Sequence, residues 1–180
     1  RTLENGPAVE VLIASQFRQW WPHVQHSYPN TALAAIGDHI TGGFLDYSVY
    51  ALAQEPRPAW DNSPLYQRND VTEDPWYRLH GVVASLNDAL AVMDAGLEVP
   101  NEPRARAFAK LMQGVARGYI ALEFDQALIV TEQSDLDAMD PLDYRPYDEV
   151  MAQAIAELDE AIAIAEANDF TIPGDLEWMN

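Results

Sequence analysis

Three long segments of this chain repeat apolar side chains at alternating steps of four and three residues, and this spacing is the strongest constraint on its fold. An α-helix turns once in about 3.6 residues, so side chains at these steps lie on one face. The spacing predicts helices over residues 76–95, 104–124 and 146–168. Their predicted buried stripes are Trp76, Leu79, Val83, Leu86, Leu90 and Met93 in the first, Phe108, Leu111, Val115, Tyr119 and Leu122 in the second, and Met151, Ile155, Leu158, Ile162 and Ala165 in the third.

Residues that start or stop helices stand at the ends of these segments. Asp74 can cap the first segment, Pro75 suits its first helical position, and Gly96 fits its end. Pro103 and Pro146 stand in the same way at the starts of the second and third segments. We therefore expect each helix to begin and end close to these residues.

Two earlier helices are also expected, over residues 7–21 and 30–54. Pro22 discourages continuation of the first, because proline lacks a backbone donor. Gly37 and the pair at 42–43 allow a kink or break in the second. The apolar positions are Val9, Leu12, Ile13, Phe17 and Trp20 in the first, and Leu33, Ile36, Ile40 and Phe44, followed by Tyr47 or Val49, in the second.

The pattern as a whole predicts an all-α protein. No run alternates polar and apolar residues over more than a few positions, so a sheet is not supported. Short loops between helices favour antiparallel helix pairs in a tetratricopeptide-like helical array. Gly114 and Gly118 would let a neighbouring helix approach closely. With 180 residues, we expect one domain spanning 1–180.

Charge limits the partners of the chain. It holds 10 basic and 29 acidic residues, a net charge of −19, and residues 119–180 alone hold 1 and 16, a net charge of −15. Nucleic acid and anionic lipid surfaces both require basic residues, so we expect neither as a partner. No stretch is long and apolar enough to predict a transmembrane segment. With no cysteine, disulfides and thiolate metal sites are excluded.

Sequence motifs for catalysis are missing. The pair of glycines at 42–43 lacks the surrounding residues of a phosphate-binding loop, and neither a nucleophile elbow nor a zinc helix occurs. His23 and His26, near His39, could gather a metal, and the aspartates of 134–143 could bind calcium. Both groups are more typical of solvated surface residues. We therefore expect no enzymatic activity, no cofactor and no metal ion.

Aromatic residues near helix ends and in proline-rich loops are the candidate ligand-binding residues. Flat rings stack on the apolar faces of sugars, and nearby polar groups bind the hydroxyls. Arg57, Asp61, Asn62 and Arg68 could supply those polar groups. The alternative is that the rings close the ends of the helical array. The five candidates are Trp20, Trp21, Tyr28, Trp60 and Tyr66.

Residues 76–87 resemble a helix of the SusD/RagB-like proteins with the pattern W-x-x-x-Y-x-x-I-x-x-x-N. Trp76, Val83 and Asn87 fall on its tryptophan, isoleucine and asparagine positions, and His80 replaces its tyrosine. The order of the segments that follow is also similar to that family.

Residues 104–130 are similar to the next helix of the family, which is rich in alanine and arginine and runs into a turn with glycine and proline. Residues 124–127 lack that glycine and proline. Residues 144–150, leading into 155–161, resemble the family's following helix, with the Leu158–Asp159 pair in inverted order. The resemblance covers about half of the chain well.

The resemblance implies a surface-exposed lipoprotein of the bacterial outer membrane. Such a protein binds a glycan or peptide and delivers it to a TonB-dependent, SusC-like transporter. Members of the family are longer, so the chain corresponds to the N-terminal, tetratricopeptide-like part, and the lipid-bearing cysteine is expected ahead of Arg1.

A helical repeat scaffold for protein–protein interaction is the alternative. It predicts a groove for a partner peptide, such as a basic one, that faces the acidic residues 119–180. Salt separates the two functions, because added salt weakens an electrostatic complex and leaves stacking on a neutral sugar nearly unchanged.

Overall fold

The computed structural model describes residues 2–26, 34–35, 37–40, 50, 52–53, 55–56 and 70–170. In this part of the chain the protein is all-α, with antiparallel helix pairs as predicted and one short two-stranded ladder. The elements are η1 (Thr2–Glu4), α1 (Gly6–His26), α4 (Asp70–Asp94), α5 (Glu102–Glu123), β1 (Gln126–Ala127), β2 (Arg145–Pro146) and α6 (Tyr147–Ala167).

The chain divides into two compact units. The first comprises Arg1–Gln19 and Leu79–Asn180, and the second comprises Trp20–Arg78. Most of α1, α4, α5 and α6 therefore belongs to the first unit, which holds the features described below. That residues 1–180 form a single domain stays a prediction.

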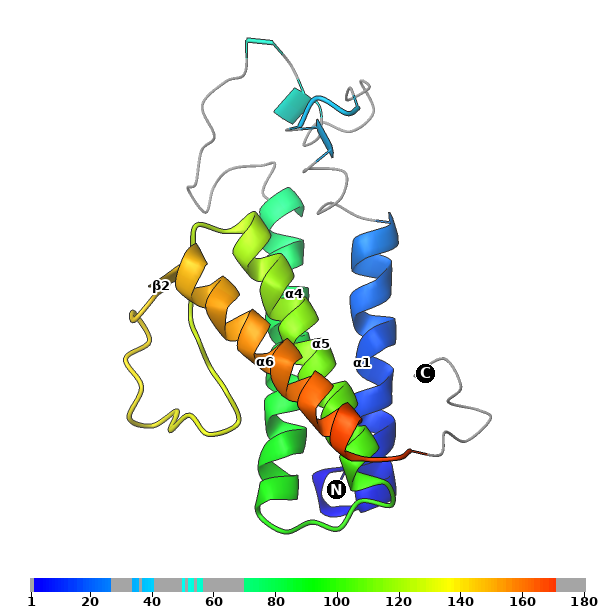
Figure 1. The fold of residues 1–180 in the computed structure, drawn as a ribbon. Coiled ribbons are helices and arrows are strands. Elements are labelled where there is room, and N and C mark those ends of the chain that lie inside the picture. Colours follow the sequence, from blue (N-terminus) through cyan, green and yellow to red (C-terminus); the bar gives the residue numbers. More distant parts are fainter. Residues whose placement is uncertain are drawn as a thin grey trace. The chain divides into compact units, whose positions relative to one another are not determined.

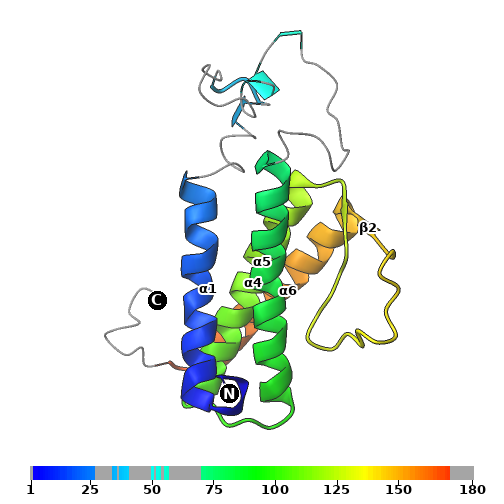
Figure 2. The same cartoon turned by 180° about the vertical axis from the view of Figure 1, so that it is seen from behind.

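The helices of the first unit run alternately up and down (Figure 1). Residues 95–101 connect α4 to α5, which returns in the opposite direction, and α6 then crosses α5 obliquely. Seen from behind, α1 and α4 lie in front of α5, and α6 lies on its far side (Figure 2). α5 is thus the central helix of this unit, with neighbours on both sides.

α4 buries the stripe that its sequence predicts. Leu79, Leu86 and Leu90 are fully buried, and Val83 and Met93 nearly so. Trp76, at the start of the predicted stripe, is only half-buried. The helix ends as expected at Gly96, which has a φ of 96°. The Gly96 N–H donates to Met93 O at 3.0 Å, a turn that glycine adopts without steric cost.

Two predicted helix ends are wrong. α4 begins at Asp70, so Pro75 lies inside it, and α1 continues through Pro22 to His26. Pro75 is the sixth residue of α4 and Pro22 is the fifth from the end of α1. A proline so close to a helix end removes a single hydrogen bond and leaves the longer side of the helix intact.

The predicted helix over 30–54 lies mostly outside the described residues. Within it, residues 34–35 are helical and residues 37–40 form a turn and a bend. The sequence allows either a kink or a break at Gly37, and the turn that begins there corresponds to a break.

The predicted stripes of α5 and α6 are wrong except at Phe108, which is buried as predicted. Leu111, Leu122, Ile155 and Ile162 are exposed, and the buried face of each helix lies about one residue away. A shift of one residue turns a helical face by about 100°. The buried residues of α6 are Val150, Ala154, Glu157 and Ala161. Those of α5 are five alanines, Phe108, Met112, Gly114 and Ile120, together with the polar residues Arg104, Lys110, Gln113 and Arg117.

A buried ion pair joins α5 to α6. Arg117 Nη2 lies 2.9 Å from Glu157 Oε1, and each side chain is only 2% exposed. Arg117 Nη2 also donates to Val130 O at 2.8 Å, and Gln153 Nε2 donates to Glu157 Oε1 at 3.3 Å. Charges can be buried in this way because each has a partner and further hydrogen bonds.

A second group of charged residues, in which Lys110 and Glu132 are buried and Glu160 is exposed, links the same helices to the segment between β1 and β2. Lys110 Nζ lies 2.7 Å from Glu132 Oε1 and 2.9 Å from Glu160 Oε2. Gln113 Nε2 donates to Glu132 Oε2 at 3.2 Å. Hydrogen bonding to Lys110 is among the causes that lower the pKa of Glu132 despite its burial, so this carboxylate is ionised at neutral pH.

Small residues set the distance between α5 and α6. A Cβ atom added at Gly114 would lie 2.6 Å from Leu158 Cγ and 2.8 Å from Ala154 O, whereas one at Gly118 would lie 4.0 Å from Ala154 Cβ. The close helix crossing predicted at this pair therefore exists at Gly114.

We expect Gly114→Ala to lower the free energy of unfolding by about 1–3 kcal/mol, because the added methyl group meets a backbone carbonyl that cannot turn away. Gly118→Ala is the matched control. It has room, so the helix propensity of alanine should leave stability unchanged or raise it by up to about 1 kcal/mol. Urea unfolding of both variants tests this, and equal effects would contradict it.

Candidate functional site

A groove forms where α5 ends and α6 begins. α5 stops at Phe124, which is extended, with φ −124° and ψ 139°. β1 then pairs antiparallel with β2, and the Tyr147 N–H donates to Asp125 O at 2.9 Å. These contacts hold the last turn of α5 beside the first turn of α6, although more than twenty residues separate the two helices in the sequence.

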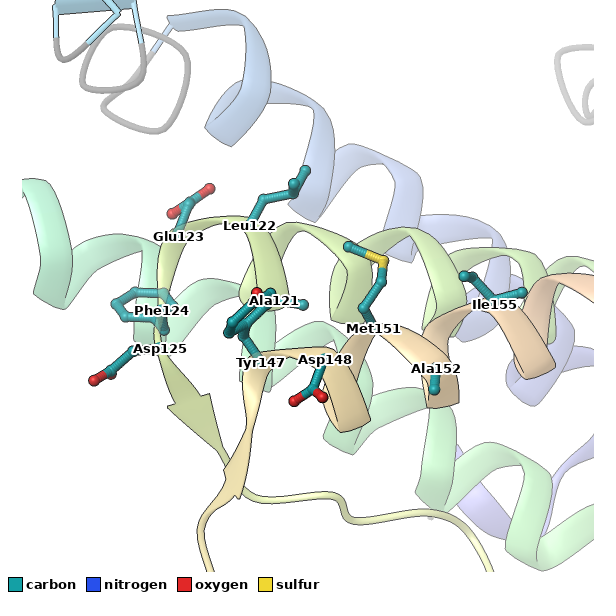
Figure 3. Close-up of a pocket in the computed structure, with 10 residues that line it drawn as sticks. All are labelled: Ala121, Leu122, Glu123, Phe124, Asp125, Tyr147, Asp148, Met151, Ala152 and Ile155. Carbon is teal, nitrogen blue, oxygen red and sulfur yellow. The ribbon is translucent and has the colours of Figure 1, made fainter.

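The groove has a volume of about 570 Å³. Its apolar residues include Leu122 and Ile155, which are 60% and 51% exposed, and the Tyr147 ring, 58% exposed. In the close-up, Tyr147 and Met151 lie in the middle, Glu123 lies on one side, and Asp125 and Asp148 lie on the other (Figure 3). The ten lining residues are Ala121, Leu122, Glu123, Phe124, Asp125, Tyr147, Asp148, Met151, Ala152 and Ile155.

The charges of the groove all have one sign. Glu123, Asp125 and Asp148 are its only ionisable residues besides Tyr147, and none of the ten lining residues is basic. Glu123 Oε1 is buried and has no hydrogen-bond partner among the described residues. Because burial penalises its charged form, the pKa of Glu123 is raised to about 8.

The neighbouring carboxylate Glu149 differs from these three. Its Oε2 lies 2.6 Å from Arg145 Nη2, so its charge is neutralised on the surface. Asp148 precedes it in the first turn of α6, where the helix dipole stabilises a negative charge. No ion pair is found for Asp125 or Asp148 in the part of the chain that the structure describes. The groove is therefore apolar at its centre and uniformly acidic at its edge.

A second cavity of about 340 Å³ lies near the other ends of the same two helices. Arg104 is the one charged residue among those that line it, and it is paired with Glu10 of α1. The cavity is otherwise apolar, so it offers a ligand fewer polar contacts than the groove. The lining residues are Arg104, Ala107, Phe108, Leu111, Leu158, Ala161, Ile162, Ala165 and Phe170.

Two of the five predicted ligand-binding aromatic residues are described by the structure. Trp20 and Trp21 follow each other in α1, with ring centroids 5.9 Å apart and planes tilted by 52°. Trp21 is 42% exposed and Trp20 is half-buried. The predicted residues Tyr28, Trp60 and Tyr66 lie outside the described residues, as do Arg57, Asp61, Asn62 and Arg68. Whether the five rings form one site stays a prediction.

The acidic loop predicted as a solvated surface segment uses its aspartates in turns. Asp135 Oδ1 accepts the Asp137 N–H at 3.1 Å, and Asp140 Oδ1 accepts the Leu142 N–H at 2.9 Å. Side chains that accept neighbouring backbone donors in this way stabilise turns. Within the described ranges, no three His, Asp or Glu side chains are placed to hold a metal ion.

Sequence reasoning missed the groove because it assigned Met151, Ile155 and Leu122 to the core. The same residues carry a usable signal. Each of these helices, α5 and α6, has an apolar stripe and, next to it, a face of alanine and charged residues. Either face could be the buried one. The sequence therefore signals the ambiguity but does not resolve it.

No helix in the described part of the chain is long and apolar enough to cross a membrane. Comparisons with protein-family models, with curated proteins and with solved structures find no match to this chain.

Proposed function

We propose that this chain is the helical part of a SusD/RagB-like nutrient-binding protein at the bacterial outer membrane. It binds a glycan or peptide without chemical change and delivers it to a TonB-dependent transporter. The protein is anchored by a lipid on a cysteine that precedes this chain.

The observation that carries the proposal is the role of Asn87, the asparagine of the motif. Asn87 is buried in α4, and its Nδ2 donates to Val130 O at 3.0 Å. Its Oδ1 accepts from Gln113 Nε2 of α5 at 2.6 Å. A side chain with both a donor and an acceptor is required to connect α4, α5 and the segment after α5 in this way. The residue that supports the resemblance thus has a specific structural task.

The arrangement of the helices supports the same proposal. The three motif-bearing segments become α4, α5 and α6 and pack together in chain order. Such an array is a scaffold that presents loops and helix ends to a ligand or partner.

A helical scaffold for protein–protein interaction is the second candidate. The exposed apolar residues of α5 and α6, such as Leu122 and Ile155, favour it, because such a patch usually marks an interaction site. Salt distinguishes the two functions, since a charged protein partner dissociates as ionic strength rises and a stacked neutral sugar does not.

Binding of neutral oligosaccharides, followed by tryptophan fluorescence and calorimetry, tests the nutrient-binding function. Stacked rings contribute about 1–2 kcal/mol each, so we expect Trp21→Ala and Trp60→Ala each to weaken binding by about five- to thirtyfold. Tyr77→Ala is the control, because Tyr77 is 67% exposed and is not a candidate. Unchanged affinity in both tryptophan variants would remove these residues from the site.

The gene around this segment provides an independent test of the family assignment. We expect a lipoprotein export signal with its cysteine upstream, a long continuation downstream and an adjacent transporter gene. A stop codon soon after Asn180 with no export signal would overturn the assignment.

A further inference from the structure

We propose that the groove between the end of α5 and the start of α6 binds a short peptide segment that carries basic side chains next to apolar ones. This inference rests on the second candidate function, the interaction scaffold, and gives it a site and a class of partner. It depends on the residues of the groove alone, so it can fail or hold independently of the family assignment.

The centre of the groove requires an apolar ligand group. Leu122, Tyr147 and Ile155 are each more than half exposed and lie around one depression of about 570 Å³. Met151, which is half-buried, lies in its middle (Figure 3). Methionine is flexible and adapts to side chains of different shape, which suits a surface that binds peptides. A leucine or similar side chain in the groove would remove these groups from water.

The edge of the groove requires a cation. Glu123, Asp125 and Asp148 surround the apolar centre from two sides, and no lining residue is basic. The carboxylates of Asp125 and Asp148 are exposed and have no ion pair among the described residues, so an ammonium or guanidinium group of the ligand would be their counter-ion. The rings of Phe124 and Tyr147 would add cation–π attraction.

Charge complementarity favours a basic peptide over other occupants. A second copy of the chain would bring the Asp125 and Asp148 carboxylates against their own counterparts, which costs free energy. Anionic lipid is repelled by residues 119–180, with their net charge of −15. A neutral glycan would leave the carboxylates of Asp125 and Asp148 without a counter-ion. A peptide with lysine or arginine beside leucine satisfies both the centre and the edge.

The test uses the 180-residue chain and a capped hexapeptide of alternating lysine and leucine, with binding measured by calorimetry. We expect binding to this peptide and none to the peptide in which glutamate replaces lysine. The double variant Asp125→Asn, Asp148→Asn should weaken binding at least about tenfold. Asp88→Asn, Asp137→Asn is the matched control. It removes two exposed carboxylates that do not line the groove, so affinity should stay within about twofold.

Met151→Glu separates this proposal from simple attraction to an acidic protein. It adds a fourth carboxylate and destroys the apolar centre, so we expect weaker binding, whereas a purely electrostatic complex would become stronger. Circular dichroism verifies that each variant is folded. Equal losses in the two double variants, or tighter binding by Met151→Glu, would overturn the proposal.

Discussion

Replacing Glu157 with alanine is expected to lower the free energy of unfolding by about 3–5 kcal/mol. The variant leaves the guanidinium of Arg117 buried, at 2% exposure, with only the Val130 carbonyl and no carboxylate as partner. A buried charge without its counter-ion retains most of its desolvation cost. Such a loss is a large fraction of the total stability of a domain of this size. Urea unfolding monitored by circular dichroism at neutral pH measures it.

Glu149→Ala is the matched control for this prediction. Glu149 lies on the same helix and pairs with Arg145, but both side chains are 45% exposed, so its loss should cost no more than about 1 kcal/mol. The double variant Arg117→Met, Glu157→Leu should recover most of the lost stability, because apolar residues of similar size replace the whole pair. If Glu157→Ala were as mild as Glu149→Ala, the pair would not be buried in solution.

The contrast between α4 and α5 shows what the sequence could predict. α4 packs one apolar stripe against its neighbours, so the spacing of Leu79, Leu86 and Leu90 identifies both the helix and its buried face. In α5 the spacing identifies the helix but indicates the wrong face. Its core side combines alanines and a few large apolar residues such as Ile120 with the buried polar residues Arg117 and Gln113, whose partners come from other elements. Hydrophobic periodicity cannot detect a face that is buried by pairing polar groups over long sequence distances.

The candidate site was missed for the same reason, because the spacing of apolar residues does not show which face of a helix is buried. The prediction of ligand-binding rings relies on aromatic residues near helix ends and in loops. The structure describes two of them, Trp20 and Trp21, and their role in binding stays a prediction. The groove consists of residues that the stripe of α6 assigned to the core, such as Met151 and Ile155. Only the contact between α5 and α6, made at Gly114 and Ala154, shows that this stripe is turned outward. A single sequence contains little information on that contact.

Glu123→Gln is expected to stabilise the protein at alkaline pH and to leave it nearly unchanged in acid. The pKa of Glu123 is raised by burial from the ordinary value of 4.5 to about 8. Between these two pH values the folded state holds a proton that the unfolded state has lost, so stability falls as pH rises. The loss begins near pH 4.5 and is complete above about pH 8. Glutamine has no such proton and avoids the loss.

The full shift corresponds to about 5 kcal/mol by linkage, and partial exposure of the side chain reduces the expected difference to about 2–3 kcal/mol. Urea unfolding of both proteins at pH 4 and pH 9 measures this difference. Glu166→Gln, an exposed carboxylate on α6, is the control and should show no pH-dependent effect. A difference of the same size at both pH values would mean that packing, and not ionisation, distinguishes the two side chains.

The same carboxylate connects stability to binding. At neutral pH Glu123 is mostly protonated in the free groove, because its pKa is about 8. A bound lysine would favour the ionised form, so binding of the lysine–leucine peptide should release up to one proton. Calorimetry in two buffers of different ionisation enthalpy measures that release, and Glu123→Gln should abolish it. Together the two results would show that the bound cation stabilises the ionised form of Glu123, which burial disfavours in the free protein.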